Sequence, residues 1–292
     1  MRKYKGEIAL LFVALTWGTG FVATAVALQQ FGTFQVLAIR FILSALILGT
    51  VFFKKILTID KTNFKYGITL GMILIGGYIF QTTGLLYTTP ANNAFIVATC
   101  VVIVPFIGTI IYRRKLDANN ILGAFTAMAG IIVMSFTIDA GFNFGDAITL
   151  VGTVFFAFHL FYTSEFRSRG SDTACIVTIQ IATCGIVAAI GALVSGQTDF
   201  SRAAPSGIAI LLFMAVFTTS ICFFTQTWAQ KYVSETKAVI IISSECIFGA
   251  ALSIFLRFES FSIRMFFGAV MILCGMLITE IRPMARKKKA EQ

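Results

Sequence analysis

Charged residues are scarce in this chain: they make up 12% of its 292 residues, against 58% for hydrophobic residues. A soluble fold of this size could not cover so large an apolar core with so few charges. The scarcity therefore excludes an ordinary soluble protein. The charges that are present are mostly basic and give a net charge of +10. They stand in short clusters between apolar runs, which argues against a nucleic-acid partner.

Residues that carry metal or redox chemistry are also few. The chain has one His, and no pair among its six Cys has the CxxC spacing of a zinc or redox site. We therefore expect no metal, no cofactor and no disulfide. All six Cys fall within apolar runs, where a thiol packs as a small side chain.

Motifs of enzymes and ATP-driven pumps are missing as well. The sequence contains no P-loop, no GxSxG and no aqueous domain. This excludes a self-contained ATP-driven pump, and we expect no enzyme activity. A membrane enzyme with a dispersed polar site is the alternative from another class, and the small number of carboxylates and the single His disfavour it.

What the chain has instead is ten apolar runs, each long enough to cross a hydrocarbon core of about 30 Å as a helix. Backbone groups in lipid must bond internally, so the runs are expected to be helices and the fold an all-α integral membrane protein. The runs are Gly6–Leu28, Phe34–Phe53, Phe64–Leu86, Pro90–Tyr112, Asn119–Thr137, Gly145–Glu165, Thr173–Val194, Pro205–Trp228, Thr236–Leu256 and Phe261–Ile281.

The basic residues indicate how the chain is oriented. Nineteen of the 23 Lys and Arg residues fall on one side of these runs and three on the other, while Arg40 lies inside a run. Because cytoplasmic loops carry the excess of Lys and Arg, we expect both termini in the cytoplasm and an even number of spans in the cytoplasmic membrane. The basic tail after Ile281 is expected to contact anionic membrane lipid.

The second half of the chain repeats the first. QTTGLLYTTPANNAF, which begins at Gln81, returns as QTWAQKYVSETKAVI at Gln226, a shift of 145 residues, and a shift of about 139 relates the starts of the two halves. Five spans in each half would invert the second copy, which is the plan of many secondary transporters. We therefore predict two inverted five-helix repeats, residues 1–140 and 141–292. The first run could also be read as a secretory signal, but it matches an internal run and is long for a signal.

The order of these motifs resembles the EamA-domain family of the drug/metabolite transporter superfamily. The resemblance is carried by GEIALLFVALTWGTGF at the start, GDAITLVGTVFFAFH at the midpoint, and YTTPANNAFIVATCVVIVP with its counterpart YVSETKAVIIISSECIFGA. LRFESFSIRMFFGAVMILCGMLI is similar to the family's acidic turn and last helix. The resemblance to the family covers nearly the whole chain, from Gly6 to Arg282.

Two positions depart from the family pattern. Cys246 stands where the family usually has Pro, which removes the usual cause of a kink in the ninth run. The run Arg113, Arg114, Lys115 replaces an acidic residue that the second half keeps as Glu259, which argues against a symmetric gating role for that turn.

A proline also interrupts the helical pattern of the fourth run. Pro105 should kink this run, and because its counterpart in the second half is Ala250, we expect that kink to be asymmetric.

The resemblance implies a ten-helix transporter with a central cavity between its halves. Family members move small metabolites, notably amino acids and related compounds, often outward. We expect alternating access, with protons as a possible coupling ion. A passive facilitator or exchanger and a lipid-intermediate flippase are the alternatives on the same fold. The substrate, the direction of transport, the coupling ion and the oligomeric state stay open at this point.

Ionisable side chains inside the runs are the first candidates for function, because they are costly in lipid. Glu245 lies near the middle of the ninth run, where changing solvation would let it exchange a proton or bind a cation. His159 in the sixth run could relay protons or contact substrate. We predict these two as coupling residues, with a structural acid and a packing histidine as the alternatives.

Arg40 and Gln180 occupy matching positions in the two halves. Arg40 could attract a carboxylate or a phosphate, but we expect it to snorkel or to form a structural ion pair. Trp17 lies near the middle of the first run, too deep in the membrane for the belt of aromatic residues at the lipid–water interface. This depth favours a place in the cavity lining over packing in the core. Gln81 and Gln226 occupy matching positions at opposite depths of the membrane. We expect them either to form an outer and an inner gate or to join neighbouring helices by hydrogen bonds. The complete predicted substrate-binding set is Trp17, Tyr78, Gln81, Thr88, Asn93, Phe156, His159, Tyr162, Gln226 and Glu245.

Overall fold

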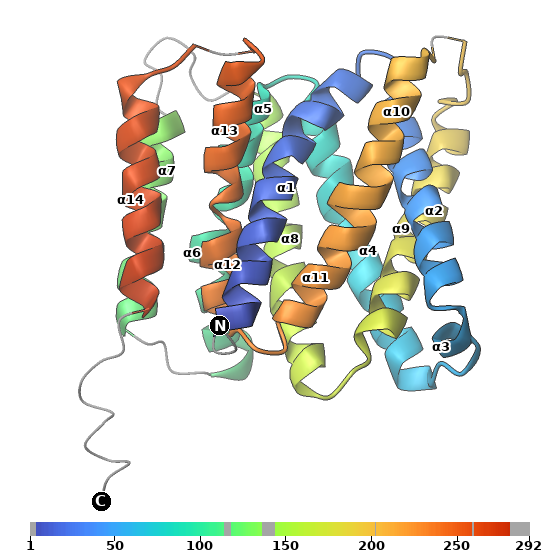
Figure 1. Ribbon diagram of the computed structural model, residues 1–292, viewed down its shortest axis with the longest axis horizontal. Coiled ribbons are helices and arrows are strands. Elements are labelled where there is room, and N and C mark those ends of the chain that lie inside the picture. Colours follow the sequence, from blue (N-terminus) through green and yellow to red (C-terminus); the bar gives the residue numbers. More distant parts are fainter. Residues whose placement is uncertain (1–3, 114–117, 136–143, 202, 259, 281–292) are drawn as a thin grey trace, which may run out of the picture.

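A computed structural model describes residues 4–113, 118–135, 144–201, 203–258 and 260–280, and all of its regular structure in these ranges is helical. Figure 1 shows the helices side by side in one bundle. The first half contains α1 (Lys5–Ala27), α2 (Thr33–Val51), α3 (Phe53–Leu57), α4 (Lys61–Gly84), α5 (Pro90–Ala98), α6 (Cys100–Tyr112) and α7 (Ala118–Ser135).

The second half contains α8 (Phe144–Ser168), α9 (Thr173–Val194), α10 (Pro205–Phe213), η2 (Met214–Ile221), α11 (Cys222–Ala229), α12 (Glu235–Ile242), α13 (Glu245–Phe255) and α14 (Ile263–Glu280). Arg114, Lys115 and Glu259, the junction at 136–143 and the basic tail lie outside the described residues.

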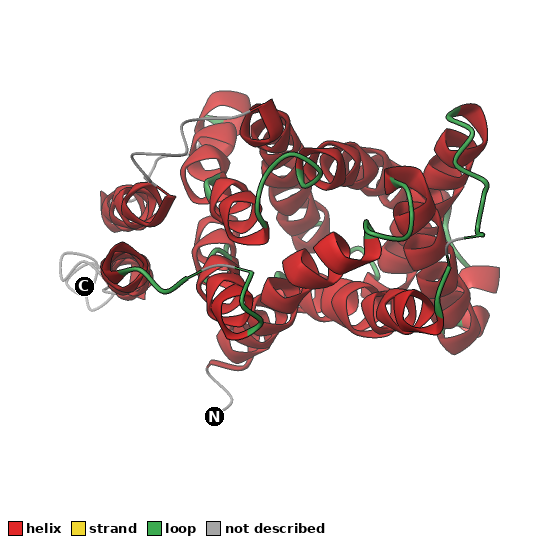
Figure 2. Ribbon diagram, turned by 90° about the horizontal axis from the view of Figure 1, so that it is seen from above, coloured by secondary structure: helices red, strands yellow, loops and turns green. Residues whose placement is uncertain are grey.

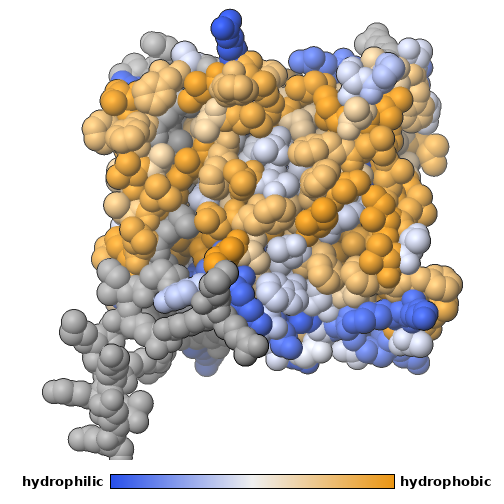
Figure 3. Space-filling model, viewed as in Figure 1, coloured by the Kyte–Doolittle hydropathy of each residue, from blue (hydrophilic) through white to orange (hydrophobic). Residues whose placement is uncertain are grey.

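Seven stretches of helix are long and apolar enough to cross a membrane among the described residues. On the face that Figure 3 shows, most of the surface is hydrophobic, and hydrophilic side chains gather along the lower edge. The seven stretches are Lys5–Ala27, Thr33–Val51, Pro90–Ile111, Phe144–Ser168, Thr173–Val194, Pro205–Ala229 and Glu235–Phe255. Helices α7 and α14 hold shorter apolar stretches, and α4 is not among the seven. The prediction of an all-helical membrane protein is thus confirmed, while the count of ten spans stays a prediction.

Several helices begin where a side chain can cap the first turn. Asp60 accepts a hydrogen bond from the backbone N–H of Asn63 at 2.7 Å, and Asp172 accepts one from Ala174 at 2.8 Å. Thr89 caps α5, in which Pro90 occupies the first turn, where a missing N–H costs little. These polar residues fix where the long apolar helices start.

Two of the expected helices are interrupted at matching positions. The fourth run breaks at Thr99, between α5 and α6, and the ninth breaks at Ser243–Ser244, between α12 and α13. The ninth run is thus interrupted even though Cys246 replaces the family's Pro, whereas the asymmetric kink expected at Pro105, inside α6, stays a prediction. The side chains of Ser243, Ser244 and Cys246 donate to backbone carbonyls, which competes with the helical ladder.

The eighth run contains a further irregularity. Between α10 and α11 the backbone winds as a π-helix over Met214–Ile221. Such segments inside α-helices are rare and are often found at functional sites. The counterpart in the first half, α4, is continuous from Lys61 to Gly84.

Helices α7 and α14 form a pair at one side of the bundle (Figures 1 and 2). Their backbones approach closely at two glycines. A Cβ on Gly130 would lie 2.6 Å from the carbonyl oxygen of Gly268, and one on Gly275 would lie 2.6 Å from that of Gly123. This is the small-residue packing expected between membrane helices, and it leaves the remaining helices to enclose the centre of the bundle.

Candidate functional site

A cavity of about 70 Å³ lies in the centre of the bundle, lined by both halves of the chain. Its walls come from α1, α2, α4, α5, α6, α8, η2, α11, α12 and α13. Seven residues singled out from the sequence line it: Trp17, Arg40, Tyr78, Gln81, Phe156, His159 and Glu245. Its residues in α1 and α4 fall in the second half of each helix, so the cavity is displaced away from the end that holds the N-terminus.

Arg40 provides a buried cationic group in this cavity, with only 4% of its surface exposed. Its Nε donates to the hydroxyl of Thr219 at 2.5 Å, and Nη2 donates to the Tyr78 hydroxyl at 3.2 Å. The guanidinium also lies 4.7 Å from the centre of the Tyr78 ring. The expectation of snorkelling or an ion pair is not met, because Arg40 is held by neutral groups within the described part of the chain.

The π-helical segment η2 is what holds Arg40 in place. The carbonyl oxygen of Thr218 accepts from Trp17 Nε1 at 2.8 Å and from Arg40 Nη2 at 3.5 Å. The carbonyl of Ala215 accepts from two serine hydroxyls, those of Ser44 and Ser220. The wider winding of the π-helix turns these oxygens toward α1 and α2. Thr218 and Thr219 were not predicted as site residues, although two adjacent threonines in an apolar run are a usable signal.

Glu245 provides an acidic group in the lining of the same cavity. It is 5% exposed and begins α13, directly after the interruption of the ninth run. Its carboxylate has no hydrogen bond or ion pair to any described residue, and it faces the cavity. Tyr78 lies within electrostatic reach of both Arg40 and Glu245, so the two opposite charges share one space.

Aromatic rings form the wall between the two charges. Trp17 packs on Phe223 with ring centres 5.1 Å apart, and Tyr78 packs edge-on against Phe156, also at 5.1 Å. Phe223 also contacts the ring of His159 at 6.0 Å. These edge and tilted contacts fix the rings in place. The result is an apolar surface flanked by one cationic and one anionic group.

His159 lies in the cavity wall but has a partner. Its Nε2 is 3.2 Å from the Oε1 of Gln180, and both residues are buried. Gln180 itself does not line the cavity. The two halves of the chain therefore place different groups at the matching positions: Arg40 reaches the cavity directly, whereas Gln180 reaches it through His159.

Four residues of the predicted substrate-binding set lie outside the cavity. Asn93 links helices by donating to the carbonyl of Gln81 and the hydroxyl of Thr149, and Gln226 donates to the Oε1 of Gln230. Tyr162 stacks among other aromatic rings, and Thr88 donates to Asp146 at 2.6 Å. In this arrangement Gln81 faces the cavity while its counterpart Gln226 does not.

Contacts at the two ends of the bundle follow the internal repeat. At the end that holds the N-terminus, Lys237 Nζ lies 2.7 Å from Glu7 Oε1, joining α12 to α1. At the other end, Asp146 at the start of α8 accepts from Thr88, just before α5. Glu7 and Asp146 occupy equivalent positions in the two halves. The shift of about 139 residues relates these two positions, but the contacts they make were not predicted from the sequence.

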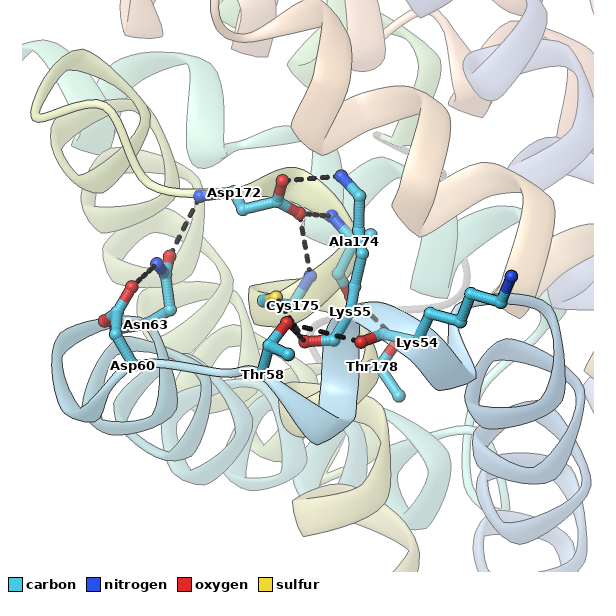
Figure 4. Close-up of polar contacts among 9 residues, drawn as sticks. All are labelled: Lys54, Lys55, Thr58, Asp60, Asn63, Asp172, Ala174, Cys175 and Thr178. Atoms are coloured by element: carbon cyan, nitrogen blue, oxygen red, sulfur yellow. Dashed lines mark hydrogen bonds and ion pairs between the residues drawn. The ribbon is translucent and has the colours of Figure 1, made fainter.

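A second polar cluster joins the halves beside α3, as Figure 4 shows. Asp172 accepts from Lys55 Nζ at 2.6 Å, and its backbone N–H donates to Asn63 at 2.9 Å. Partial burial raises the pKa of Asp172, but hydrogen bonds from Lys55, Cys175 and Ala174 outweigh it and leave that pKa below its usual value of 3.8. This cluster ties α3 and α4 to the start of α9, far from the cavity lining.

Comparisons with known proteins agree with this architecture. The EamA-like transporter family matches residues 4–136 and again residues 143–281. An uncharacterized transporter from Archaeoglobus fulgidus is 30% identical over 97% of this chain and 88% of its own length. The uncharacterized transporter YoaV of Bacillus subtilis is 20% identical over 97% of this chain and 99% of its own length. A solved crystal structure superposes with a TM-score of 0.77 at 16% identity, covering 99% of this chain and all of that one, which shows a shared fold.

Proposed function

The chain belongs to the EamA-like transporter family, and from this premise we propose that it is a secondary transporter that exports a small metabolite by alternating access. An amino acid or a related compound is the substrate class we favour. We place the protein in the cytoplasmic membrane with both termini in the cytoplasm. Its ten spans form two inverted repeats, residues 1–140 and 141–292, in line with the two stretches matched by the family.

The observation that carries this proposal is the pair of opposite charges in one apolar cavity. The guanidinium of Arg40 matches a carboxylate, the carboxylate of Glu245 matches an ammonium group, and aromatic rings lie between them. A zwitterion with an apolar side chain satisfies all three features at once. A sugar phosphate would leave Glu245 facing a second negative charge, so the arrangement disfavours it.

Alternating access is supported by contacts at the ends of the bundle. The cavity reaches toward the end away from the N-terminus, while the Glu7–Lys237 ion pair and a contact of Lys5 with the Tyr232 ring close the other end. We assign these contacts to an inner gate and the Asp146–Thr88 contact to an outer gate. Rocking of the two repeats would open one gate while closing the other.

We assign Glu245 as the coupling residue, with His159 as the second candidate. The charged or titratable groups that face Glu245 within the cavity or from helices around it are Arg40, Tyr78, Cys100, His159, Cys222 and Cys246. None of the described residues donates a hydrogen bond to Glu245. A proton or a substrate ammonium group would therefore neutralise it in alternate access states.

Purified protein in proteoliposomes provides the test. Vesicles loaded with unlabelled neutral amino acids should accumulate labelled amino acid by exchange. The corresponding amine, which lacks the carboxylate, and the corresponding acid, which lacks the ammonium group, should compete poorly. Exchange of nucleosides or sugar phosphates in place of amino acids would contradict the substrate class. Movement of a labelled lipid between leaflets would favour the flippase, and exchange indifferent to any ion gradient would favour the facilitator.

A further inference from the structure

The interruptions of the fourth and ninth runs meet at one point beside the cavity. The first lies at Thr99 and the second at Ser243–Ser244. The hydroxyl of Ser243 donates to the carbonyl of Ala98 at 3.1 Å, and these two residues are 145 apart, which is the shift of the internal repeat. The two interruptions are thus in contact across the pseudo-twofold axis. Helix ends at such breaks gather backbone oxygens that lack their usual helical partners.

The side chains at this point present acceptors rather than donors to the cavity. Ser243 lines the cavity, and its hydroxyl donates its hydrogen bond to the carbonyl of Ala98. The hydroxyl oxygen can therefore only accept a hydrogen bond from a ligand or coordinate a cation. Trp17 Nε1 is already used by the Thr218 carbonyl. The carboxylate of Glu245 has no donor among the described residues. A carboxylate and a hydroxyl oxygen therefore face the same space at the break. Arg40, which shares the cavity, is held by Thr219 and Tyr78 and forms no ion pair with Glu245.

An unpaired carboxylate in an apolar interior is costly, so the site calls for a cation. One carboxylate with neutral oxygens matches a monovalent ion, and carboxylate, hydroxyl and carbonyl oxygens are ligands for hard cations. A soft metal ion does not fit. The nearby Cys246 and Cys100 keep their thiol protons on the carbonyls of Ser243 and Thr153, and the described residues hold no cluster of three metal-binding side chains.

We propose that a sodium ion binds at the paired helix interruption, between the carboxylate of Glu245 and the hydroxyl oxygen of Ser243, and competes there with the ammonium group of the substrate. The competition rests on the proposed function, whereas sodium binding itself does not. Because the cavity is small, one cation at a time neutralises Glu245. Substrate leaving outward would be replaced by sodium, and sodium released inward would be replaced by substrate. The result is exchange, in which inward sodium flow drives export.

Binding is measured on the purified full-length protein without substrate. Thermal unfolding is followed between about 1 and 100 mM NaCl, with choline chloride keeping the ionic strength constant at neutral pH. The unfolding midpoint should rise with NaCl and reach a plateau, and KCl should act more weakly. Glu245→Gln should abolish the rise. Ser243→Ala should weaken sodium binding by about tenfold, since one ligand is lost.

Ser244→Ala is the matched control. Ser244 is the adjacent buried serine and also donates to a carbonyl, that of Ile241, but it does not line the cavity. Its replacement should leave sodium binding within about twofold of the wild type. Size-exclusion profiles show whether each variant is folded. A sodium effect that persists in Glu245→Gln, or that Ser243→Ala and Ser244→Ala weaken equally, overturns the site.

A separate arm distinguishes this inference from the proposed function. Addition of an amino acid should also raise the unfolding midpoint, and its apparent affinity should fall as NaCl increases. Stabilisation by the amino acid without any effect of sodium overturns the sodium site and leaves the transport proposal standing. Stabilisation by sodium alone overturns the amino-acid substrate and keeps the ion site. Transport that responds to a proton gradient and not to a sodium gradient overturns sodium in favour of the proton.

Discussion

At the scale of single residues, Arg40 shows how a charge is kept inside an apolar bundle. Its partners are a hydroxyl, a ring and a backbone carbonyl, all neutral, so its positive charge stays available to a ligand. A partnering carboxylate would have neutralised it in place. The same holds for Glu245, which has no donor among the described residues. Two charges that each lack an ion-pair partner among the described residues are the features a zwitterion would complete.

Replacement of Arg40 should therefore affect transport more than folding. Arg40→Gln removes the charge but keeps hydrogen-bonding capacity toward Thr219 and Tyr78. Exchange of amino acid in proteoliposomes should fall by at least about tenfold, because a charge-assisted hydrogen bond to the substrate carboxylate is lost. Arg169→Gln, an exposed arginine paired with Glu165 away from the cavity, is the control. Unchanged exchange in Arg40→Gln would mean that the carboxylate binds elsewhere.

At the scale of helices, the structure differs from regular spans where the proposed site lies. Ser243 at one interruption and Thr218 in the π-helical segment line the cavity, and the interruption at Thr99 lies between the lining residues Val97 and Cys100. Contacts between helices also differ in kind at the two ends of the bundle. The contact assigned to the inner gate includes an ion pair between Glu7 and Lys237, and the one assigned to the outer gate includes a hydrogen bond from Thr88 to Asp146.

Weakening the ion pair should shift the balance between access states. Glu7→Gln removes it, and because both side chains are only partly buried, the loss is at most about 1 kcal/mol, or roughly fivefold in the ratio of states. The reporter is Thr227→Cys, a buried position on α11 whose hydroxyl has no partner in the described structure. A membrane-impermeant thiol reagent applied from the cytoplasmic side should label it faster in Glu7→Gln. The exchanged pair Glu7→Lys with Lys237→Glu should restore slow labelling, and if it does not, the ion pair is not the gate.

The Asp172 cluster should give the fold a stability that depends on pH. Because its folded-state pKa lies below the ordinary value of 3.8, the contribution is complete above that value and is lost as the pH falls through the lowered pKa. Both side chains of the Lys55–Asp172 pair are more than a third exposed, so the effect is about 1 kcal/mol or less. Thermal unfolding of Asp172→Asn should fall short of the wild type at neutral pH, and the deficit should shrink as the pH falls below 3.8 through the lowered pKa. An equal deficit at every pH would assign the effect to the helix cap rather than to the charge.

At the scale of the whole molecule, the apolar runs predicted most of the fold. The helix Thr173–Val194 has the bounds expected from the sequence, and the other runs are helical over most of their described length. Periodic hydrophobicity determines such helices locally. The interruption at Ser243–Ser244 was not predictable in the same way, because it depends on a contact with Ala98 in the other half. Likewise, the residues next to Arg40 in the sequence do not indicate that η2 supplies its hydrogen-bond partners. The position of Arg40 in the cavity therefore depends on the tertiary structure.

The orientation of the whole chain is the remaining prediction, and two exposed serines at the ends of α9 test it. Ser168 precedes α9 and Ser195 follows it, so a single span separates them. The excess of Lys and Arg places Ser168 in the cytoplasm and Ser195 outside. Of the native cysteines, five are buried and Cys274 is exposed, so Cys274→Ser provides the background. In intact cells an impermeant thiol reagent should label Ser195→Cys directly and Ser168→Cys only after permeabilisation. The reverse pattern would invert the assignment of inner and outer gates, and labelling of both from outside would contradict α9 as a span.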